Sequence, residues 1–370
     1  MPDAPISFAR GAPAPELLPA TELAECAFDA ARRWGAPLFA YGPGAGHAPL
    51  REWVAARHGV DSARVVLTVG GLLGFVLYAG EMLARRPGRV LVEAPTYDRP
   101  LKILAREGVE VVPLETDAEG LDPAAVEEEL RRNESVPAFL YTIPTFQNPS
   151  GHTLGRAGRD RLLQAARETG ATILEDDPYG LLRFEGDPLP QLFELSGGEG
   201  AILLSSFSKT VSPGIRVGYV VLPEELVGAI ERQVLENYVS PSIFAQAALA
   251  EFVHEGFFEP NLEHACEGLR IRRDAMLGAL EREAPEGLSW NEPEGGYFLW
   301  LELPEGVDAG VLLARGEEAG VTFVKGSDFF LNGGGTSSAR LAYSFETADE
   351  IGVGVERLAG LVREAAGVTA

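Results

Sequence analysis

Short apolar runs alternate with amphipathic stretches through the middle of the chain. Many of the runs are β-branched and lack the polar alternation of a strand with one face in water. The pattern predicts buried strands at 65–69, 90–93, 109–113, 139–143, 171–175, 202–206 and 217–222. Between them, helical spacing of apolar residues predicts helices at 72–85, 100–107, 123–132 and 156–168. Strands that alternate with helices indicate an α/β fold with a mostly parallel, doubly wound sheet.

The pattern changes after residue 222. Helical stretches follow at 224–238 and 242–283, then shorter strands at 296–303, 321–325 and 339–344, and a terminal helix at 349–365. This predicts a smaller α+β domain that the N-terminal segment joins. We expect a large domain at 39–265 with helices on both faces of its sheet, and a small domain built from 1–38 and 266–370.

Composition and charge narrow the choice of partners. The 370 residues carry a formal net charge of −24, which argues against nucleic acid and against anionic membranes. No apolar run approaches the ~18 residues of a membrane span, and the first residues lack the basic and apolar regions of a signal peptide. Two cysteines and scattered histidines suggest neither a disulfide framework nor a metal site. We expect a cytoplasmic protein that acts on small molecules.

One lysine stands out because lysine is rare in this chain. Only Lys102, Lys209 and Lys325 occur, and arginine supplies nearly all of the positive charge. Lys209 follows Ser206 and Ser208, and Arg216 lies seven positions further on. A desolvated lysine can lose its proton and attack a carbonyl, which arginine cannot do. An imine-forming amine beside groups that suit a phosphate indicates pyridoxal 5′-phosphate (PLP), although a surface lysine in a polar loop has the same local sequence.

Further candidates follow predicted strands, where ligands gather in parallel sheets. Gly70 and Gly71 open a helix after the strand at 65–69 and suit an anion, or form an ordinary strand-to-helix turn. Tyr97 is placed to stack on a flat ring, with core packing as the alternative. Asn148 sits in a rigid turn between prolines, from which its amide can donate to a phenolate or a carboxylate.

Three charged or polar residues complete the set. Asp176 closes the strand at 171–175, and its carboxylate suits a pyridine nitrogen; the alternative is a cap at the strand end. Tyr179 follows it by three residues. Arg340 lies among apolar residues in a late strand, where its planar guanidinium suits a carboxylate or a structural salt bridge.

Taken in order, these residues resemble the fold-type I, PLP-dependent aminotransferases of class I/II. The closer likeness is to the 2-aminoadipate and kynurenine aminotransferase branch. It is carried by these residues and by Ile6-Ser7-Phe8-Ala9, Pro13-Ala14-Pro15-Glu16-Leu17, Tyr41-Gly42, Phe146-Gln147-Asn148-Pro149 and Gly295-Gly296-Tyr297-Phe298. The resemblance covers nearly the whole chain.

The resemblance implies a role for each matching position. Lys209 would hold PLP as a Schiff base and shuttle the proton, with Asp176 and Tyr179 as the other catalytic residues. The remaining cofactor contacts would come from Tyr41, Gly70, Gly71, Leu72, Tyr97, Asn148, Ser206, Ser208 and Arg216. Arg340, Asn148 and Gly11 would bind the substrate. Tyr41 typically reaches the phosphate of the neighbouring subunit in this family, which implies a homodimer with shared active sites.

The chain departs from the family pattern at two places. Gly71-Leu72-Leu73 replaces a turn that is usually Ser-Gln-Gln-like, which removes side chains that could contact the phosphate. Arg10 stands where a small residue is common, and it either meets a distal carboxylate of the substrate or faces solvent. The expected activity is transfer of an amino group from a 2-aminoadipate-, glutamate-, aromatic- or branched-chain-type L-amino acid to a 2-oxo acid such as 2-oxoglutarate, by a ping-pong mechanism. A PLP-dependent β-lyase is the alternative, and a non-catalytic PLP-sensing module is a more remote one.

Overall fold

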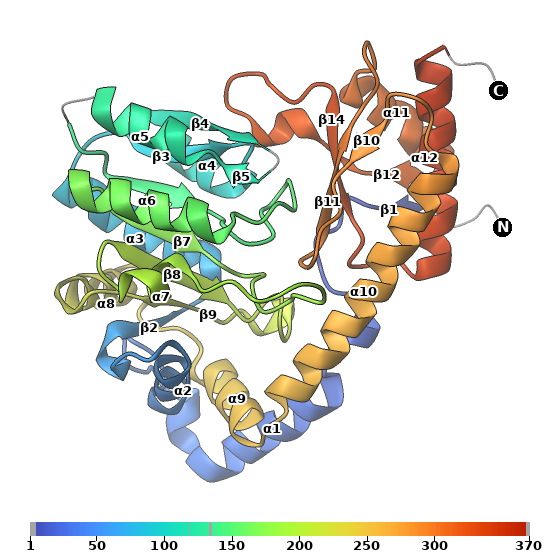
Figure 1. Cartoon of the computed structure of the whole chain (residues 1–370). Coiled ribbons are helices and arrows are strands. Elements are labelled where there is room, and N and C mark those ends of the chain that lie inside the picture. Colours follow the sequence, from blue (N-terminus) through green and yellow to red (C-terminus); the bar gives the residue numbers. More distant parts are fainter. Residues whose placement is uncertain (1–4, 118, 133–134, 368–370) are drawn as a thin grey trace.

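The computed structural model describes residues 5–117, 119–132 and 135–367. A large sheet forms one part of the molecule, and a smaller sheet lies beside it (Figure 1). The large sheet has the strand order β2 (Val65–Thr68), β9 (Gly218–Val221), β8 (Ala201–Ser206), β7 (Ile173–Asp176), β6 (Phe139–Thr142), β3 (Val90–Ala94), β4 (Val111–Asp117) and β5 (Gly120–Leu121). Neighbouring strands from β8 to β4 are parallel, whereas β9 is antiparallel to β2 and β8, and β5 to β4. The predicted mostly parallel sheet is confirmed.

Helices cover both faces of this sheet because its strands are apolar on both sides. Val90 and Val92 of β3 belong to the core under α3 (Gly71–Arg85), α4 (Asp98–Arg106) and α8 (Glu224–Tyr238). Leu91, which points the other way, packs with α5 (Pro123–Arg132), α6 (Arg156–Thr169) and α7 (Leu192–Ser196). On that same side, α2 (Ala48–His58) and α9 (Ile243–His254) pack over β2, β9 and β8. The alternation of single residues thus gives each face of the sheet an apolar core of its own.

The smaller sheet is antiparallel and has its own core. Its strand order is β10 (Ser289–Trp290), β11 (Phe298–Glu302), β14 (Ser338–Ala342) and β13 (Val324–Lys325). The long helix α10 (Phe258–Glu283), α11 (Ala309–Ala319) and α12 (Ala348–Ala365) pack into that core, together with Ile6 and Phe8 of the N-terminal segment. None of the helices in the described part of the chain is long and apolar enough to cross a membrane.

The N-terminal segment divides its contacts between the two sheets. The short strand β1 (Ile6–Ser7) pairs in parallel with β12 (Val321–Thr322), so the chain start joins the C-terminal part. In contrast, α1 (Ala20–Trp34) packs on α9 beside the large sheet. The boundaries at 39–265 and at 1–38 with 266–370 stay a prediction. Short 3₁₀ turns lie at Pro15–Leu17, Ala36–Phe39, Ser62–Arg64, Pro213–Ile215 and Gly326–Phe329.

Two sequence expectations differ locally from the structure. The apolar stretch at 321–325 is not one strand but two, because β12 pairs with β1 while β13 pairs with β14. The expected helical stretch at 242–283 is broken into α9 and α10 by a turn at Glu255–Phe257, where Gly256 has a positive φ of 81°. The pattern also did not single out α1, α2, α7 and α11.

A buried arginine fastens the loop after β6 to the sheet. Arg159 of α6 is fully buried, and its guanidinium donates to the carbonyl oxygens of Leu154, at 2.8 Å, and Pro144, at 3.0 Å. It also lies 3.8 Å from the buried carboxylate of Glu175. That carboxylate accepts backbone N–H groups at the start of α7. Glu175, next to the candidate Asp176, is therefore a structural residue.

We predict that Arg159→Ala destabilises the protein by about 3–5 kcal/mol, because it leaves the Glu175 carboxylate and several carbonyl oxygens buried without their partner. Urea unfolding, followed by circular dichroism, measures the change. Arg156→Ala is the matched control on the same helix: the Arg156 side chain is 56% exposed and pairs with Asp160 on the surface, so its effect is expected within about 0.5 kcal/mol. Equal effects of the two substitutions would contradict the assignment.

Candidate active site

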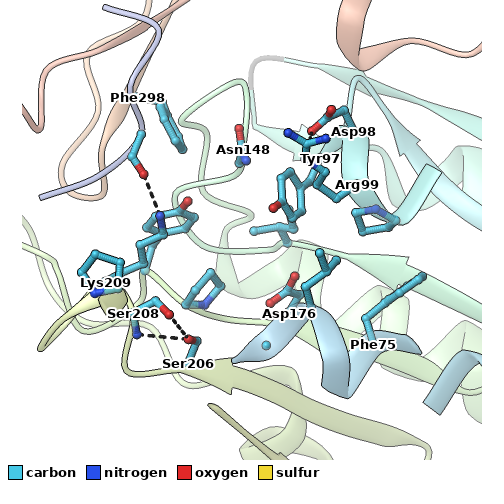
Figure 2. A pocket seen from close by; sticks show the side chains of 18 of the residues that line it. Phe75, Tyr97, Asp98, Arg99, Asn148, Asp176, Ser206, Ser208, Lys209 and Phe298 are labelled. Atoms are coloured by element: carbon cyan, nitrogen blue, oxygen red, sulfur yellow. Dashed lines mark hydrogen bonds and ion pairs between the residues drawn. The ribbon is translucent and has the colours of Figure 1, made fainter. Parts of the chain in front are cut away.

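A cavity of about 400 Å³ opens at the carboxyl ends of the parallel strands (Figure 2). Its walls come from the ends of several strands of the large sheet, from the N-terminal segment and from β11 and β14 of the smaller sheet. The lining residues are Gly11, Gly71, Leu72, Phe75, Tyr97, Asp98, Arg99, Pro100, Ile143, Asn148, Asp176, Pro178, Tyr179, Ser206, Ser208, Lys209, Pro213, Arg216, Phe298 and Arg340. Most residues predicted from the sequence as site residues are thus brought together here.

Lys209 follows β8 and carries its amine into this cavity. Nζ donates to the carbonyl oxygen of Gly11 at 2.7 Å, as Figure 2 shows. Burial lowers the pKa of this amine from 10.5 to about 8; the positive charges of Arg340 and Arg216 act in the same direction, while Asp176 opposes them. The neutral, nucleophilic form of the amine is therefore accessible near neutral pH.

Asp176 ends β7 and lies in the floor of the cavity. The hydroxyl of Tyr141, on the neighbouring strand β6, donates to its Oδ2 at 2.7 Å. Burial raises the pKa of the Asp176 carboxyl from 3.8 to about 7, although the hydrogen bond from Tyr141 favours the charged form. A carboxylate that is so costly to ionise gains most from a cationic partner in the cavity.

Another part of the cavity wall is lined by hydrogen-bond donors. Ser206 Oγ donates to Ser208 Oγ at 2.8 Å, and Arg216 Nη1 approaches the same Ser208 oxygen at 3.4 Å. Gly70 precedes the first turn of α3 with a positive φ of 75°, and a Cβ there would lie 2.5 Å from Arg216 Nη2. A helix N-terminus, two hydroxyl groups and a guanidinium form a site suited to a phosphate.

Arg340 of β14 reaches the cavity from the smaller sheet. Its Nη1 donates to Asn148 Oδ1 and its Nη2 to the carbonyl oxygen of Ala9, each at 2.9 Å. Its guanidinium carbon lies 4.2 Å from the centre of the Phe298 ring. Burial lowers its pKa to about 10, so it stays protonated at neutral pH. Its buried Nε has no hydrogen-bond partner among the described residues, which favours an anionic ligand.

Asn148 is held in place by a buried network that sequence reasoning missed. The carboxylate of Glu93, in β3, accepts from Gln147 Nε2 at 2.9 Å and from Thr142 Oγ1 at 2.6 Å. Gln147 Oε1 in turn accepts from the backbone and the hydroxyl of Ser150. The turn around Asn148 is thus fastened on both sides to the sheet. No local signal in the sequence connects Glu93 with a turn more than fifty residues away.

Comparison with known proteins shows the family. The family model "Aminotransferase class I and II" matches residues 13–358. This chain belongs to the class I and II aminotransferases. It is 40% identical over 357 residues to a 2-aminoadipate transaminase of Thermus thermophilus, covering 95% of this chain and 89% of that protein. It is 32% identical to aromatic-amino-acid aminotransferase 1 of Thermococcus litoralis, covering 97% and 88%.

A solved structure shows the same fold. The alpha-aminoadipate aminotransferase of Thermus thermophilus, crystallised with N-(5′-phosphopyridoxyl)-L-leucine, superimposes with a TM-score of 0.93 at 37% identity, covering 99% of this chain and 94% of that one. The predicted fold-type I architecture and the prediction of an aminotransferase with PLP as its cofactor are confirmed.

The cavity fits PLP on its own chemistry. It offers an amine with a lowered pKa, a buried carboxylate that gains from a pyridinium, and a donor-rich end without a side chain at Gly70. Tyr97 and Leu72 line the space between these groups. Gly71 and Leu72 carry no polar side chain, so the hydroxyl groups of Ser206 and Ser208 and the guanidinium of Arg216 are the side-chain donors there.

Tyr41 and Arg10, both predicted as site residues, lie outside the cavity. Tyr41 is 84% exposed, and its role toward a neighbouring subunit stays a prediction. Arg10 is exposed, and its guanidinium carbon lies 4.3 Å from the centre of the Phe345 ring, so it is not among the lining residues.

The cavity also contains Asp98, Arg99 and Phe298, to which the sequence assigns no role there. The available signal for Asp98 and Arg99 is their position directly after Tyr97.

The lowered pKa of Lys209 leads to a test of this aminotransferase without substrate. We predict that cofactor-free protein combines with PLP faster as the pH rises through about 8, since the neutral amine is the reactive form and its fraction grows above the pKa. Stopped-flow absorbance across pH 6–11 measures the rate of combination. A midpoint near the ordinary lysine value of 10.5 would show that the amine is not desolvated.

Proposed function

We propose that this aminotransferase moves the amino group of an L-amino acid to a 2-oxo acid in two half-reactions, with Lys209 as the residue that attaches the cofactor and shuttles the proton. The observation that carries the proposal is the meeting of Lys209, Asp176 and Arg340 in one cavity. An amine with a lowered pKa, a carboxylate with a raised pKa and a buried guanidinium are the three groups that the reaction needs.

Arg340 and Asn148 orient the substrate. The Nε of Arg340 has no hydrogen-bond partner in the part of the chain that the structure describes and can donate to an anion, while Nη1 contacts Asn148. A planar guanidinium binds a carboxylate through two parallel hydrogen bonds, which fixes the α-carboxylate and directs Cα toward Lys209. Phe298 covers one face of this guanidinium and keeps water from it.

Lys209 moves the proton. In the first half-reaction its Nζ would carry the proton from Cα of the donor to the C4′ carbon of the bound cofactor, and in the second it would carry a proton back from C4′ to Cα of the accepting 2-oxo acid. An amine with a pKa of about 8 can do both near neutral pH. When bound, PLP supplies the carbonyl that takes up the amino group and the ring that takes up the electron pair of the Cα–H bond.

The other residues hold the cofactor. Asp176 pairs with the pyridine nitrogen, Tyr97 stacks on the ring, and Tyr179 and Asn148 donate to the ring oxygen. Ser206, Ser208, Arg216 and the backbone N–H groups at the start of α3 hold the phosphate. Arg216 has a positive φ of 52°, which is uncommon for a residue with a side chain.

The amino donors that we propose are based on the names of the similar proteins. One relative is a 2-aminoadipate transaminase and another an aromatic-amino-acid aminotransferase, which supports donors of the 2-aminoadipate and aromatic types. Donors of the glutamate and branched-chain types are proposed from the resemblance of the sequence to the family. The acceptor that we propose is 2-oxoglutarate, in a ping-pong cycle. A β-lyase differs in its products, since it releases pyruvate and ammonia without an acceptor.

We predict that Lys209→Ala abolishes transamination, with at least a ~10³-fold loss of kcat, because the attaching amine and the proton shuttle are both removed. A coupled assay with amino donors and 2-oxoglutarate measures the activity. Lys325→Ala is the matched control, since Lys325 is partly exposed and pairs with Asp328 outside the cavity. Retained transamination in Lys209→Ala contradicts the proposal, and acceptor-independent ammonia release by the wild type indicates a lyase.

We also propose a homodimer with shared active sites. Two residues before Tyr41, Phe39 is 70% exposed and stacks on Phe244, which is itself 36% exposed. Exposed aromatic clusters of this kind are typical of protein interfaces. An interface here lets Tyr41 serve the cavity of the partner, since it does not line its own.

Mixed dimers test the shared site directly. Tyr41→Ala subunits keep Lys209, and Lys209→Ala subunits keep Tyr41, so a dimer of one of each has one intact site if Tyr41 acts across the interface. We predict that refolding the two variants together restores activity well above the sum of the separate variants. Activity equal to that sum, or a monomer in light scattering, contradicts the proposal.

A further inference from the structure

Tyr297 lies behind the cavity and contacts the main chain of Lys209. Its hydroxyl donates to the carbonyl oxygen of Lys209 at 2.9 Å. The Tyr297 side chain is buried, and it is not among the residues that line the cavity. Burial raises the pKa of this phenol, so the hydroxyl stays protonated and can donate. The function proposed above gives this hydrogen bond no role.

The turn that carries Tyr297 depends on two glycines. Gly295 and Gly296 precede it, and Gly296 has a positive φ of 71°. A Cβ at Gly295 would lie 2.2 Å from the ring of Phe146, and one at Gly296 would lie 2.6 Å from Phe146 Cβ. The backbone N–H of Gly296 donates to the carbonyl oxygen of Leu182 at 3.0 Å. The turn therefore lies directly against loops of the large sheet, which fixes the direction in which Tyr297 points.

A second side chain from the C-terminal part holds the main chain next to Lys209. Asn261 of α10 donates from Nδ2 to the carbonyl oxygen of Thr210 at 2.6 Å. Two successive carbonyl oxygens thus accept hydrogen bonds from side chains that lie far along the chain. Because each peptide group is planar, a fixed carbonyl oxygen restricts the dihedral angles on either side of it. The two hydrogen bonds therefore restrict the direction of the Lys209 side chain.

The far end of the Lys209 side chain lies near the same tyrosine. Nζ is 5.3 Å from the centre of the Tyr297 ring and 5.8 Å from the centre of the Tyr179 ring. The centres of the two rings are 5.5 Å apart. Tyr297 is thus close to Lys209 at both ends, with its hydroxyl at the main chain and its ring near the amine. The two rings also occupy space beside the amine that water could otherwise fill.

We propose that Tyr297 is a positioning residue for Lys209, and that its hydrogen bond to the Lys209 carbonyl holds the amine inside the cavity. The inference rests on the proposed function and deepens it, because it names the contact that places the proton-carrying amine. Tyr297 directly precedes β11, which pairs with β14, the strand of Arg340. The smaller sheet therefore supplies the guanidinium for the substrate and also positions Lys209.

We predict that Tyr297→Phe raises the pKa of Lys209 from about 8 toward its ordinary value of 10.5. The ring stays, but the Lys209 carbonyl loses its hydrogen bond, so the segment can move and water can reach the amine. A hydrated amine is easier to protonate. The charged and titratable groups around the amine are unchanged by this substitution: Arg340, Arg216, Asp176 and Tyr179.

Competitive acetylation of the cofactor-free protein measures this pKa without any reaction of PLP. Acetic anhydride reacts with the neutral amine, and mass spectrometry follows the labelling of Lys209 across about pH 6–11. Lys102, whose side chain is 61% exposed, is the internal reference. Labelling of Lys209 is expected to rise through about pH 8 in the wild type and at a higher pH in Tyr297→Phe.

Tyr343→Phe is the matched control. Tyr343 is a buried tyrosine whose hydroxyl donates to the carbonyl oxygen of Gly295 at 2.7 Å, on the same turn as Tyr297. Each substitution removes one buried hydrogen bond, so both should lower the stability in urea, but only Tyr297→Phe should shift the labelling of Lys209. In transamination, we expect kcat of Tyr297→Phe to fall about tenfold with little change in KM, because the carboxylate site is intact.

The outcomes separate this inference from the proposed function. An unchanged Lys209 pKa in Tyr297→Phe overturns the inference, and so does an equal shift in Tyr343→Phe, which would assign the effect to the turn as a whole. If Tyr297→Phe does not fold, Asn261→Ala removes the hydrogen bond at the next carbonyl and must raise the pKa of Lys209; no shift there also overturns it. A wild type that transaminates no donor refutes the proposed function, while the labelling still decides whether Tyr297 positions Lys209.

Discussion

Lys209 carries its amine into a cavity where burial and the guanidinium groups of Arg340 and Arg216 all disfavour the protonated form, and where Asp176 is the acidic group that opposes them. The packing of the two sheets around Lys209 holds its amine in this position. Burial raises the pKa of the Asp176 carboxyl, because it disfavours the negative charge of the carboxylate. The charged form of each side chain is therefore unfavourable in the empty cavity, and a ligand with the complementary charge would stabilise it.

The rest of the structure fixes the positions of these side chains relative to one another. Strand ends of the large sheet place Asp176 and Lys209, and the smaller sheet supplies Arg340. The contact between Arg340 and Asn148 joins the two sheets at the cavity. Behind Asn148, the Glu93 network fixes the turn, and behind Glu175, Arg159 fixes the loop that follows β6. These buried polar links set geometry, because each leaves an unsatisfied charge or carbonyl if one partner moves.

The sequence predicted the large sheet well because its strands are apolar on both faces and alternate with amphipathic helices. It also predicted most of the lining residues, since parallel strands bring their carboxyl ends to one edge. What it did not predict depends on long-range pairing. The split of 321–325 follows from the partner strands β1 and β14, and the link from Glu93 to Gln147 follows from strand neighbours. Arg10 and Arg99 are both arginines near apolar runs, and only the fold shows which of them faces the cavity.

Because the chain has only three lysines, one experiment shows whether Lys209 is the amine that binds the cofactor. The protein is incubated with PLP, reduced with borohydride, digested and mapped by mass spectrometry. We expect the phosphopyridoxyl group on the peptide that contains Lys209, and not on those with Lys102 or Lys325. Equal labelling of the three lysines, or labelling of Lys102 or Lys325 in place of Lys209, would contradict this assignment.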